Sequence, residues 1–127
     1  MAEAPAQGFV AFIYTPDPER SWRFYGEALG LPLVRDEGAA RVFRVAGKAY
    51  LGVCRASEAR PCVPDGICLS IVADDVEAWH ERLTAAGVAT EGPPERLDAF
   101  GVTSFFLRDP DGHLVEIQRF DEPLAES

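Results

Sequence analysis

The chain has 127 residues, of which 47% are hydrophobic and 26% are charged, the composition of a folded globular protein rather than a disordered one. Lys and Arg number 12 against 21 Asp and Glu, which gives a formal net charge of −9 at pH 7. Nucleic-acid backbones and anionic membrane surfaces bind Lys and Arg, so this balance argues against both as partners. A cationic ligand would be attracted instead.

Targeting signals and cysteine pairs are the next class of features that the sequence argues against. Its apolar runs fall short of the roughly 18 residues that span a bilayer. The N-terminal residues lack the basic and then apolar pattern of a secretory signal. Cys54, Cys62 and Cys68 show no CxxC spacing, which argues against a disulfide framework or a zinc knuckle. We therefore expect a cytoplasmic protein.

An internal repeat organises the chain. Its markers lie 57 residues apart, with Asp17, Trp22 and Gly30 recurring as Asp74, Trp79 and Gly87. Each set follows an apolar run and brackets a stretch of helical spacing. The pattern predicts two copies of one supersecondary unit.

The first copy begins with an apolar, aromatic run that predicts a strand over Gly8–Tyr14. Asp17 is a helix cap with Pro18 at the first helical position, and Gly30 ends the helix. Three further strands are expected, over Leu31–Arg35, Arg41–Ala46 and Lys48–Cys54.

The second copy repeats this plan. Asp74 and Glu77 resemble a capping box, and Gly87 ends the helix. A DPDG turn joins the last two strands. The strands are expected over Ile67–Val72, Val88–Thr90, Gly101–Arg108 and His113–Phe120, with a loop over Glu91–Phe100.

The resulting fold class is α+β. Two tandem βαβββ modules, about residues 8–55 and 66–120, are joined by a linker over about 56–65. Together they form a single domain over residues 1–127.

Alternation in the strands places polar side chains away from the helices. In the fifth expected strand, Cys68 and Ser70 alternate with large aliphatic residues, and in the last strand Glu116 and Gln118 do the same. A Glu and a Gln on such a face need a partner, which could be water, a ligand or a metal ion.

Three segments resemble the vicinal oxygen chelate superfamily: FYGEALGLPLV (Phe24–Val34), ADDVEAWHERLTAAGV (Ala73–Val88) and FFLRDPDGHLVEIQRF (Phe105–Phe120). This superfamily includes glyoxalases, ring-cleaving dioxygenases, and fosfomycin and bleomycin resistance proteins. The resemblance implies a cup-shaped mixed sheet, a homodimer and a site in the cup between the two modules.

The resemblance also implies four metal-ligand positions, one on an inner strand of each half-module. They fall at Val10, Gly52, Cys68 and Glu116, with Tyr50 on the same face as Gly52. Only Glu116 is a usual ligand of this family, so no metal cofactor is expected. A divalent metal is the alternative, if Cys68 serves with Glu116 or the ligands lie elsewhere.

The candidate site residues follow from these faces, and on the first expected strand Phe12 and Tyr14 share the inward face with Val10. Glu116 is the candidate catalytic residue, a hydrogen-bond acceptor or general base, with a solvated carboxylate as the alternative. An inward-pointing Arg44 would suit a carboxylate ligand, with a surface charge as the alternative. Cys68 can also be a small buried hydrophobe, and the aromatic residues can fill core. The candidate ligand-binding residues are Phe12, Tyr14, Tyr50, Cys68, Ser70, Phe106 and Gln118.

The favoured function is a small-molecule-binding protein with a degenerate metal site, which sequesters a cationic or aromatic ligand as bleomycin resistance proteins do. The first alternative is a metal-dependent lyase or dioxygenase of the same superfamily. The second is a metal-free isomerase or hydrolase that uses Glu116 as its base.

Overall fold

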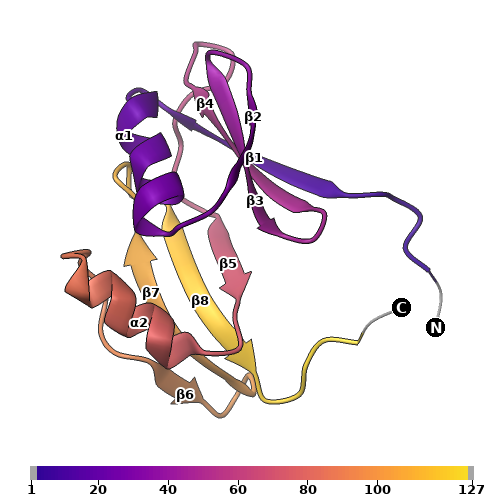
Figure 1. Ribbon diagram of the computed structural model, residues 1–127, viewed down its shortest axis with the longest axis vertical. Coiled ribbons are helices and arrows are strands. Elements are labelled where there is room, and N and C mark those ends of the chain that lie inside the picture. The colour runs from indigo at the N-terminus through magenta and orange to yellow at the C-terminus, as the bar shows by residue number, and fades with distance from the viewer. Residues whose placement is uncertain (1–2, 126–127) are drawn as a thin grey trace. The chain divides into compact units, whose positions relative to one another are not determined.

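The computed structural model describes residues 3–125 and divides the chain into two compact units, with the boundary between Val63 and Pro64. This boundary falls inside the linker predicted over residues 56–65. Each unit holds a four-stranded mixed sheet and one helical segment (Figure 1). Within residues 3–125, none of the helices has the length and apolar character needed to cross a membrane.

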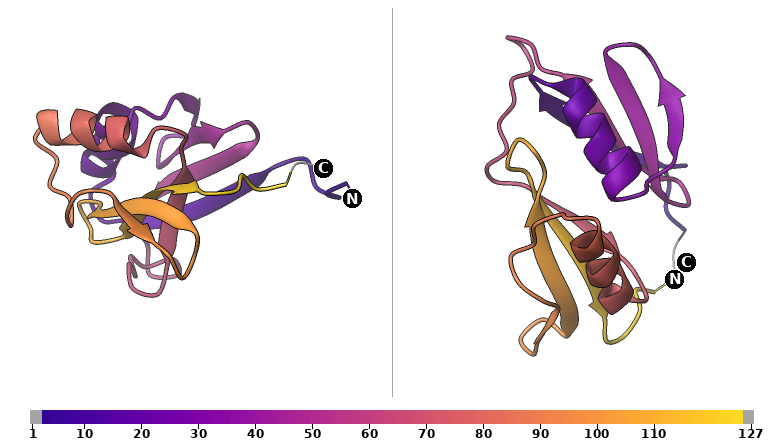
Figure 2. Two further views of the ribbon diagram at one scale, coloured as in Figure 1. Left: turned by 90° about the horizontal axis from the view of Figure 1, so that it is seen from below. Right: turned by 60° about the vertical axis from the view of Figure 1, so that its left-hand side comes forward.

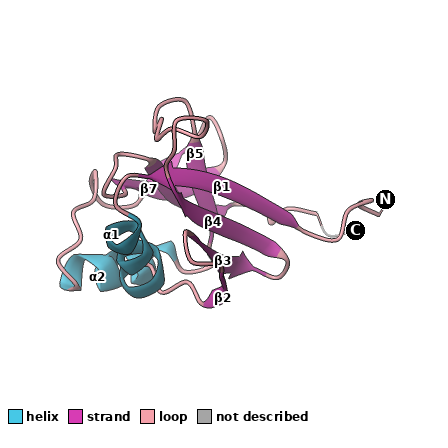
Figure 3. Cartoon of the chain, turned by 90° about the horizontal axis from the view of Figure 1, so that it is seen from above, coloured by secondary structure: helices cyan, strands magenta, loops and turns pink. Residues whose placement is uncertain are grey.

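The first unit contains a sheet with strand order β1-β4-β3-β2, in which β1 runs parallel to β4 and the other pairs are antiparallel. Figure 3 shows these four strands side by side, with the helix α1 against them. The elements are β1 (Phe9–Thr15), α1 (Pro18–Arg23), the π-helical segment η1 (Phe24–Ala28), β2 (Leu33–Asp36), β3 (Ala40–Ala46) and β4 (Ala49–Arg55).

The second unit repeats this topology with strand order β5-β8-β7-β6, and α2 packs on β7 and β8 (Figure 2). Here β5 runs parallel to β8. The elements are β5 (Cys68–Val72), α2 (Val76–Ala85), β6 (Glu95–Leu97), β7 (Val102–Arg108) and β8 (Leu114–Phe120). The predicted α+β fold of two repeated units is confirmed.

The helix caps explain why the helix of the first unit continues into a π-helical segment, η1, whereas α2 does not. The carboxylate of Asp17 accepts the backbone N–H of Arg20 at 3.3 Å, as predicted. In the second unit the cap is Asp75 rather than Asp74, and Gly30 and Gly87 end the two helices at positive φ. The first helix therefore has one residue more between its cap and its terminal glycine, and η1 accommodates it, because a π-helical turn is wider.

One strand prediction is wrong. Residues 88–90 form no strand, and β6 lies instead at Glu95–Leu97, inside the segment expected to be a loop. This three-residue strand pairs with β7, with Glu95 opposite Ser104. So short an edge strand depends on the backbone of its neighbour more than on its own side chains, which are Glu, Arg and Leu.

The core of each unit lies between the sheet and its helix. Buried apolar side chains of the strands point toward the helix, and those of the helical segment point toward the sheet. In the first unit they include Ile13, Tyr25, Leu29, Phe43, Leu51 and Val53, and in the second Val76, Leu83, Phe105, Leu107, Val115 and Ile117.

Candidate functional site

Each sheet has one face against its own helix, and we call the opposite face the open face. In β1, Ile13 and Thr15 are buried on the helix side. Because successive side chains alternate, Val10, Phe12 and Tyr14 lie on the open face. The three residues that the sequence placed together are therefore neighbours on one surface.

A close contact between β1 and β4 shapes this surface. The register pairs Val10 with Tyr50 and Phe12 with Gly52. A Cβ atom at position 52 would lie only 2.4 Å from two carbon atoms of the Phe12 ring. The ring therefore occupies the room that a side chain at position 52 would need.

The open face of the first unit carries a cavity of about 450 Å³, within the size range of roughly 300–1,000 Å³ typical of small-molecule sites. Most of its walls are apolar. The lining residues are Val10, Phe12, Val34, Arg35, Glu37, Val42, Arg44 and Tyr50. Phe12 and Tyr50 were predicted to bind ligand, whereas Tyr14 lies further along β1, outside this lining.

Two arginines at this cavity have different partners. Arg35 donates from Nη2 to Oε2 of Glu37 at 3.1 Å. Arg44 donates from Nη1 to the hydroxyl oxygen of Tyr50 at 3.2 Å and to the carbonyl oxygen of Gly47. Its guanidinium carbon also lies 5.1 Å from the centre of the Tyr50 ring, so the arginine is fixed against that ring.

The open face of the second unit carries a polar row. The hydroxyl of Ser70 donates to Oε1 of Glu116 at 2.9 Å, and the amide of Gln118 donates to the Ser70 oxygen. Phe106 lies opposite Glu116 in the β7–β8 pairing. The fold thus brings these four predicted site residues together, and the hydrogen bonds orient the Glu116 carboxylate.

Cys68 lies at the start of β5, on the same face as this row. The residue is exposed, so the alternative of a small buried hydrophobe is wrong. Partial loss of water around its thiol still raises the pKa above the ordinary 9.0, and the charge of Glu116 raises it further, while Arg108 opposes the shift. The thiolate is the form that attacks electrophiles and binds metals. A raised pKa therefore argues against Cys68 as a nucleophile or metal ligand near neutral pH.

A family model described as the Glyoxalase/Bleomycin resistance protein/Dioxygenase superfamily matches residues 7–117. The chain belongs to this superfamily. The resemblance inferred from the sequence is confirmed. Among curated proteins, no significant match is found.

Solved structures share the superfamily fold over almost their whole length. Lactoylglutathione lyase from Agrobacterium tumefaciens is 24% identical, with 92% of this chain and 96% of that chain covered and a TM-score of 0.73. A glyoxalase/bleomycin resistance protein/dioxygenase from Nocardioides is 19% identical, with coverages of 100% and 91% and a TM-score of 0.75. TioX from Micromonospora sp. ML1 is 22% identical, with coverages of 95% and 100% and a TM-score of 0.70. At these identities the likeness shows the fold.

The four positions that the superfamily resemblance assigns to metal ligands all lie on the open faces. Val10 and Gly52 belong to the first unit, Cys68 and Glu116 to the second. Val10 offers no donor atom, and the room above Gly52 is taken by the Phe12 ring. Only Glu116 presents a carboxylate, so these positions do not supply the three or more protein ligands that such a site needs.

A different group of side chains, which could hold a metal ion, lies in the turn before β8. The sequence indicated only a turn there. Donor atoms of Asp109, Asp111 and His113 lie within 4.8 Å of one another. Two carboxylates and an imidazole suit a divalent transition metal. The spacing of these residues, two apart in sequence, was the signal available for finding them.

The same group also has a structural role. Oδ1 of Asp109 accepts the backbone N–H groups of Asp111 and His113 at 3.0 and 2.9 Å. Oδ2 lies 2.8 Å from Nδ1 of His113, and both side chains are buried. These hydrogen bonds occupy the Asp109 carboxylate and Nδ1 of His113, so a metal ion that used those atoms would compete with them.

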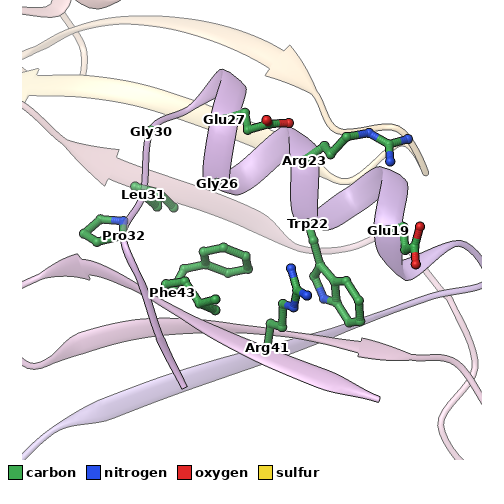
Figure 4. Close-up of a pocket in the computed structure, with 11 residues that line it drawn as sticks. Glu19, Trp22, Arg23, Gly26, Glu27, Gly30, Leu31, Pro32, Arg41 and Phe43 are labelled. Atoms are coloured by element: carbon green, nitrogen blue, oxygen red, sulfur yellow. The ribbon is translucent and has the colours of Figure 1, made fainter. Parts of the chain in front are cut away.

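A larger groove, of about 670 Å³, lies on the helix side of the first sheet, where α1 and η1 leave β3 and β2 partly uncovered (Figure 4). Trp22 forms one wall and donates from Nε1 to the carbonyl oxygen of Val53 at 2.9 Å. The guanidinium of Arg41 lies 4.3 Å from the centre of that indole ring. The charged lining residues are two of each sign, Glu19, Arg23, Glu27 and Arg41, so charge does not select a ligand here. The sequence reasoning did not find this groove.

Proposed function

We propose that this superfamily member is a small-molecule-binding protein that holds an aromatic ligand in the open-face cavity of its first unit. The observation that carries the proposal is the Phe12 ring lying over Gly52. A position at which the superfamily resemblance implies a metal ligand here has no side chain, and an aromatic wall fills its place. With Val10 and Tyr50 beside it, the surface suits stacking and apolar contact.

The experiment compares the Phe12→Ala variant with the wild type by calorimetric titration of small aromatic compounds. Loss of the ring should weaken binding by about 10-fold or more, because an aromatic contact and its buried area are both lost. Phe100→Ala is the matched control, since Phe100 is 75% exposed and belongs to the second unit. Equal affinity of the Phe12→Ala variant and the wild type would show the proposal to be wrong.

Sequestration further requires that the ligand leaves unchanged. After incubation with the protein, a bound compound should be recovered intact by chromatography with mass detection. Turnover of that compound would show that the protein is an enzyme and that the proposed binding function is wrong.

The hydrogen bonds at Glu116 favour a second candidate, a metal-free isomerase that uses this carboxylate as base. Ser70 and Gln118 hold the carboxylate in one orientation, as a proton-abstracting group requires. Under this candidate Glu116→Gln should abolish turnover, and Ser70→Ala should reduce it with the protein still folded.

The Asp109–Asp111–His113 group favours a metal-dependent lyase or dioxygenase as a third candidate. Metal analysis of protein purified without chelator tests it. Stoichiometric metal that is lost in Asp111→Asn and kept in Glu116→Gln would assign the metal to this group, and loss in the second variant alone would assign it to Glu116.

The homodimer expected from the resemblance is part of the proposal. Light scattering coupled to gel filtration should give twice the chain mass of 13.9 kDa.

A further inference from the structure

We infer that the ligand of the first unit's cavity is an aromatic carboxylate, or a close anionic equivalent, whose acidic group binds Arg44. This inference rests on the proposed function of the cavity and adds the charge of the ligand. It differs from the expectation drawn from the net charge of −9, which favoured a cationic ligand.

The hydrogen-bond donors of Arg44 are the first evidence for an acidic ligand. A guanidinium has five N–H donors, of which two belong to Nη1. In Arg44 the Nη1 donors are directed to Tyr50 and to the Gly47 carbonyl. Within the described part of the chain, no residue accepts from Nε or Nη2. Nε and Nη2 form one edge of the guanidinium, and such an edge binds a carboxylate through two parallel hydrogen bonds.

The charges around the cavity are the second evidence for an acidic ligand. Arg35 and Glu37 also line it, but they pair with each other. Across residues 3–125 the partners found for Arg44 are neutral oxygen atoms and an aromatic ring. The local charge left unbalanced at the cavity is therefore positive, although the chain as a whole is strongly acidic.

The fixed position of Arg44 is the third evidence for an acidic ligand. Contact with the Tyr50 ring and hydroxyl, together with the Gly47 carbonyl, holds the guanidinium before a ligand arrives. A donor that is already ordered loses less conformational entropy on binding. The neighbouring walls, formed by Val10, Phe12 and Val42, are apolar and suit the ring of the same ligand.

The test uses ligands that share a ring system and differ only in charge. The probes are 2-naphthoate, 2-naphthamide and 2-naphthylmethylammonium, with benzoate and indole-3-acetate and their amides as a second series. Titration calorimetry of the wild type should give the acids an affinity at least about 10-fold above the amides, because two charge-assisted hydrogen bonds are added. The ammonium compound should bind most weakly.

Variants at the arginines locate the effect. Arg44→Gln should remove the preference for acid over amide, while the affinity for the amide stays within about twofold of the wild type. Arg44→Lys should retain only part of the preference, since an ammonium lacks the planar edge. Arg60→Gln is the matched control, because it removes one positive charge from an exposed residue of the first unit that does not line the cavity. This control should keep the full preference.

The outcomes distinguish a failure of this inference from a failure of the proposed function. If amides and acids bind equally, and Phe12→Ala weakens both, the cavity binds aromatic ligands and the inference about charge is wrong. If the preference survives Arg44→Gln, the acid binds elsewhere and the inference is likewise overturned. If none of the compounds binds, whatever its charge, the proposed function falls together with this inference.

Discussion

Replacing Gly52 with alanine places a methyl group where the ring of Phe12 now lies. The three atoms nearest to the new Cβ all belong to that ring, two of them at 2.4 Å. Non-bonded carbon atoms rest at about 3.5–4.0 Å, so the ring must withdraw by roughly 1 Å or more. Because neighbouring strands restrict a small shift, we expect the ring to leave the cavity by changing its rotamer.

The change in the free energy of unfolding should be small. Phe12 is 47% exposed, so about half of its side chain is buried. Burying a whole Phe side chain stabilises by about 1.5–3 kcal/mol, so withdrawal costs about 1 kcal/mol. Alanine in a strand is favoured over glycine by about 0.5–1 kcal/mol, which offsets most of that loss. Stability should therefore change by less than about 1 kcal/mol, while aromatic ligands lose about 10-fold or more in affinity.

A double-mutant cycle measures the contact directly. In the Phe12→Ala background the methyl group meets no ring, and Gly52→Ala should then stabilise the protein by about 0.5–1 kcal/mol. The assay is urea unfolding followed by circular dichroism, applied to the wild type, both single variants and the double variant. If Gly52→Ala has the same effect in both backgrounds, the ring does not lie over residue 52 and the reasoning about the cavity is refuted.

Three further predictions concern the second unit. Asp109→Ala should cost about 3 kcal/mol or more in urea unfolding, because the buried His113 ring and two backbone N–H groups lose their acceptor. Asp109→Asn keeps an oxygen for the backbone and should cost less, so equal costs would contradict this account. Alkylation of Cys68 by iodoacetamide at pH 7.5, followed by peptide mass analysis, should be slower than that of an unperturbed thiol, because its raised pKa leaves less thiolate. Glu116→Gln should lower that pKa and speed the reaction, and a slower reaction would refute the placement of the two groups. A hydrogen bond from Arg119 of β8 lowers the pKa of Glu77 below its ordinary 4.5. The stabilisation from Glu77 is then complete above pH 4.5 and lost as the pH falls through the lower folded value. Melting temperatures of the wild type and Glu77→Gln should accordingly differ at pH 7 and converge toward pH 3, and a gap that widens in acid would contradict the sign.

Helix ends and strand faces were predictable because their signals are local. A capping carboxylate at Asp17, and a glycine that tolerates positive φ at Gly30, act within a few residues of chain. Alternation along β1 and β8 likewise indicated which side chains face the helix. The superfamily was recognisable for the same reason, because short local patterns such as these identify its repeated unit.

The second cap shows where local signals end. The spacing to Glu77 favoured Asp74 as the cap, although Asp75 is the same residue type and can cap a helix equally well. The structure chooses Asp75, and Glu77 pairs with Arg119 instead of closing a capping box. A contact with a strand more than 40 residues away decides the role of this glutamate, so no pattern within the helix could indicate it.

The sequence by itself determined the repeated α+β unit, the superfamily and the face on which Phe12, Tyr50 and Glu116 lie. Only the tertiary structure decided what these side chains touch: the Phe12 ring over Gly52, Arg44 fixed against Tyr50, and Ser70 bonded to Glu116. Except for Arg44 and Tyr50, these contacts join residues about 40 or more apart in the chain, and all of them are set by strand register. The faces follow from alternation within one strand, whereas the contacts depend on which residue of a neighbouring strand stands opposite.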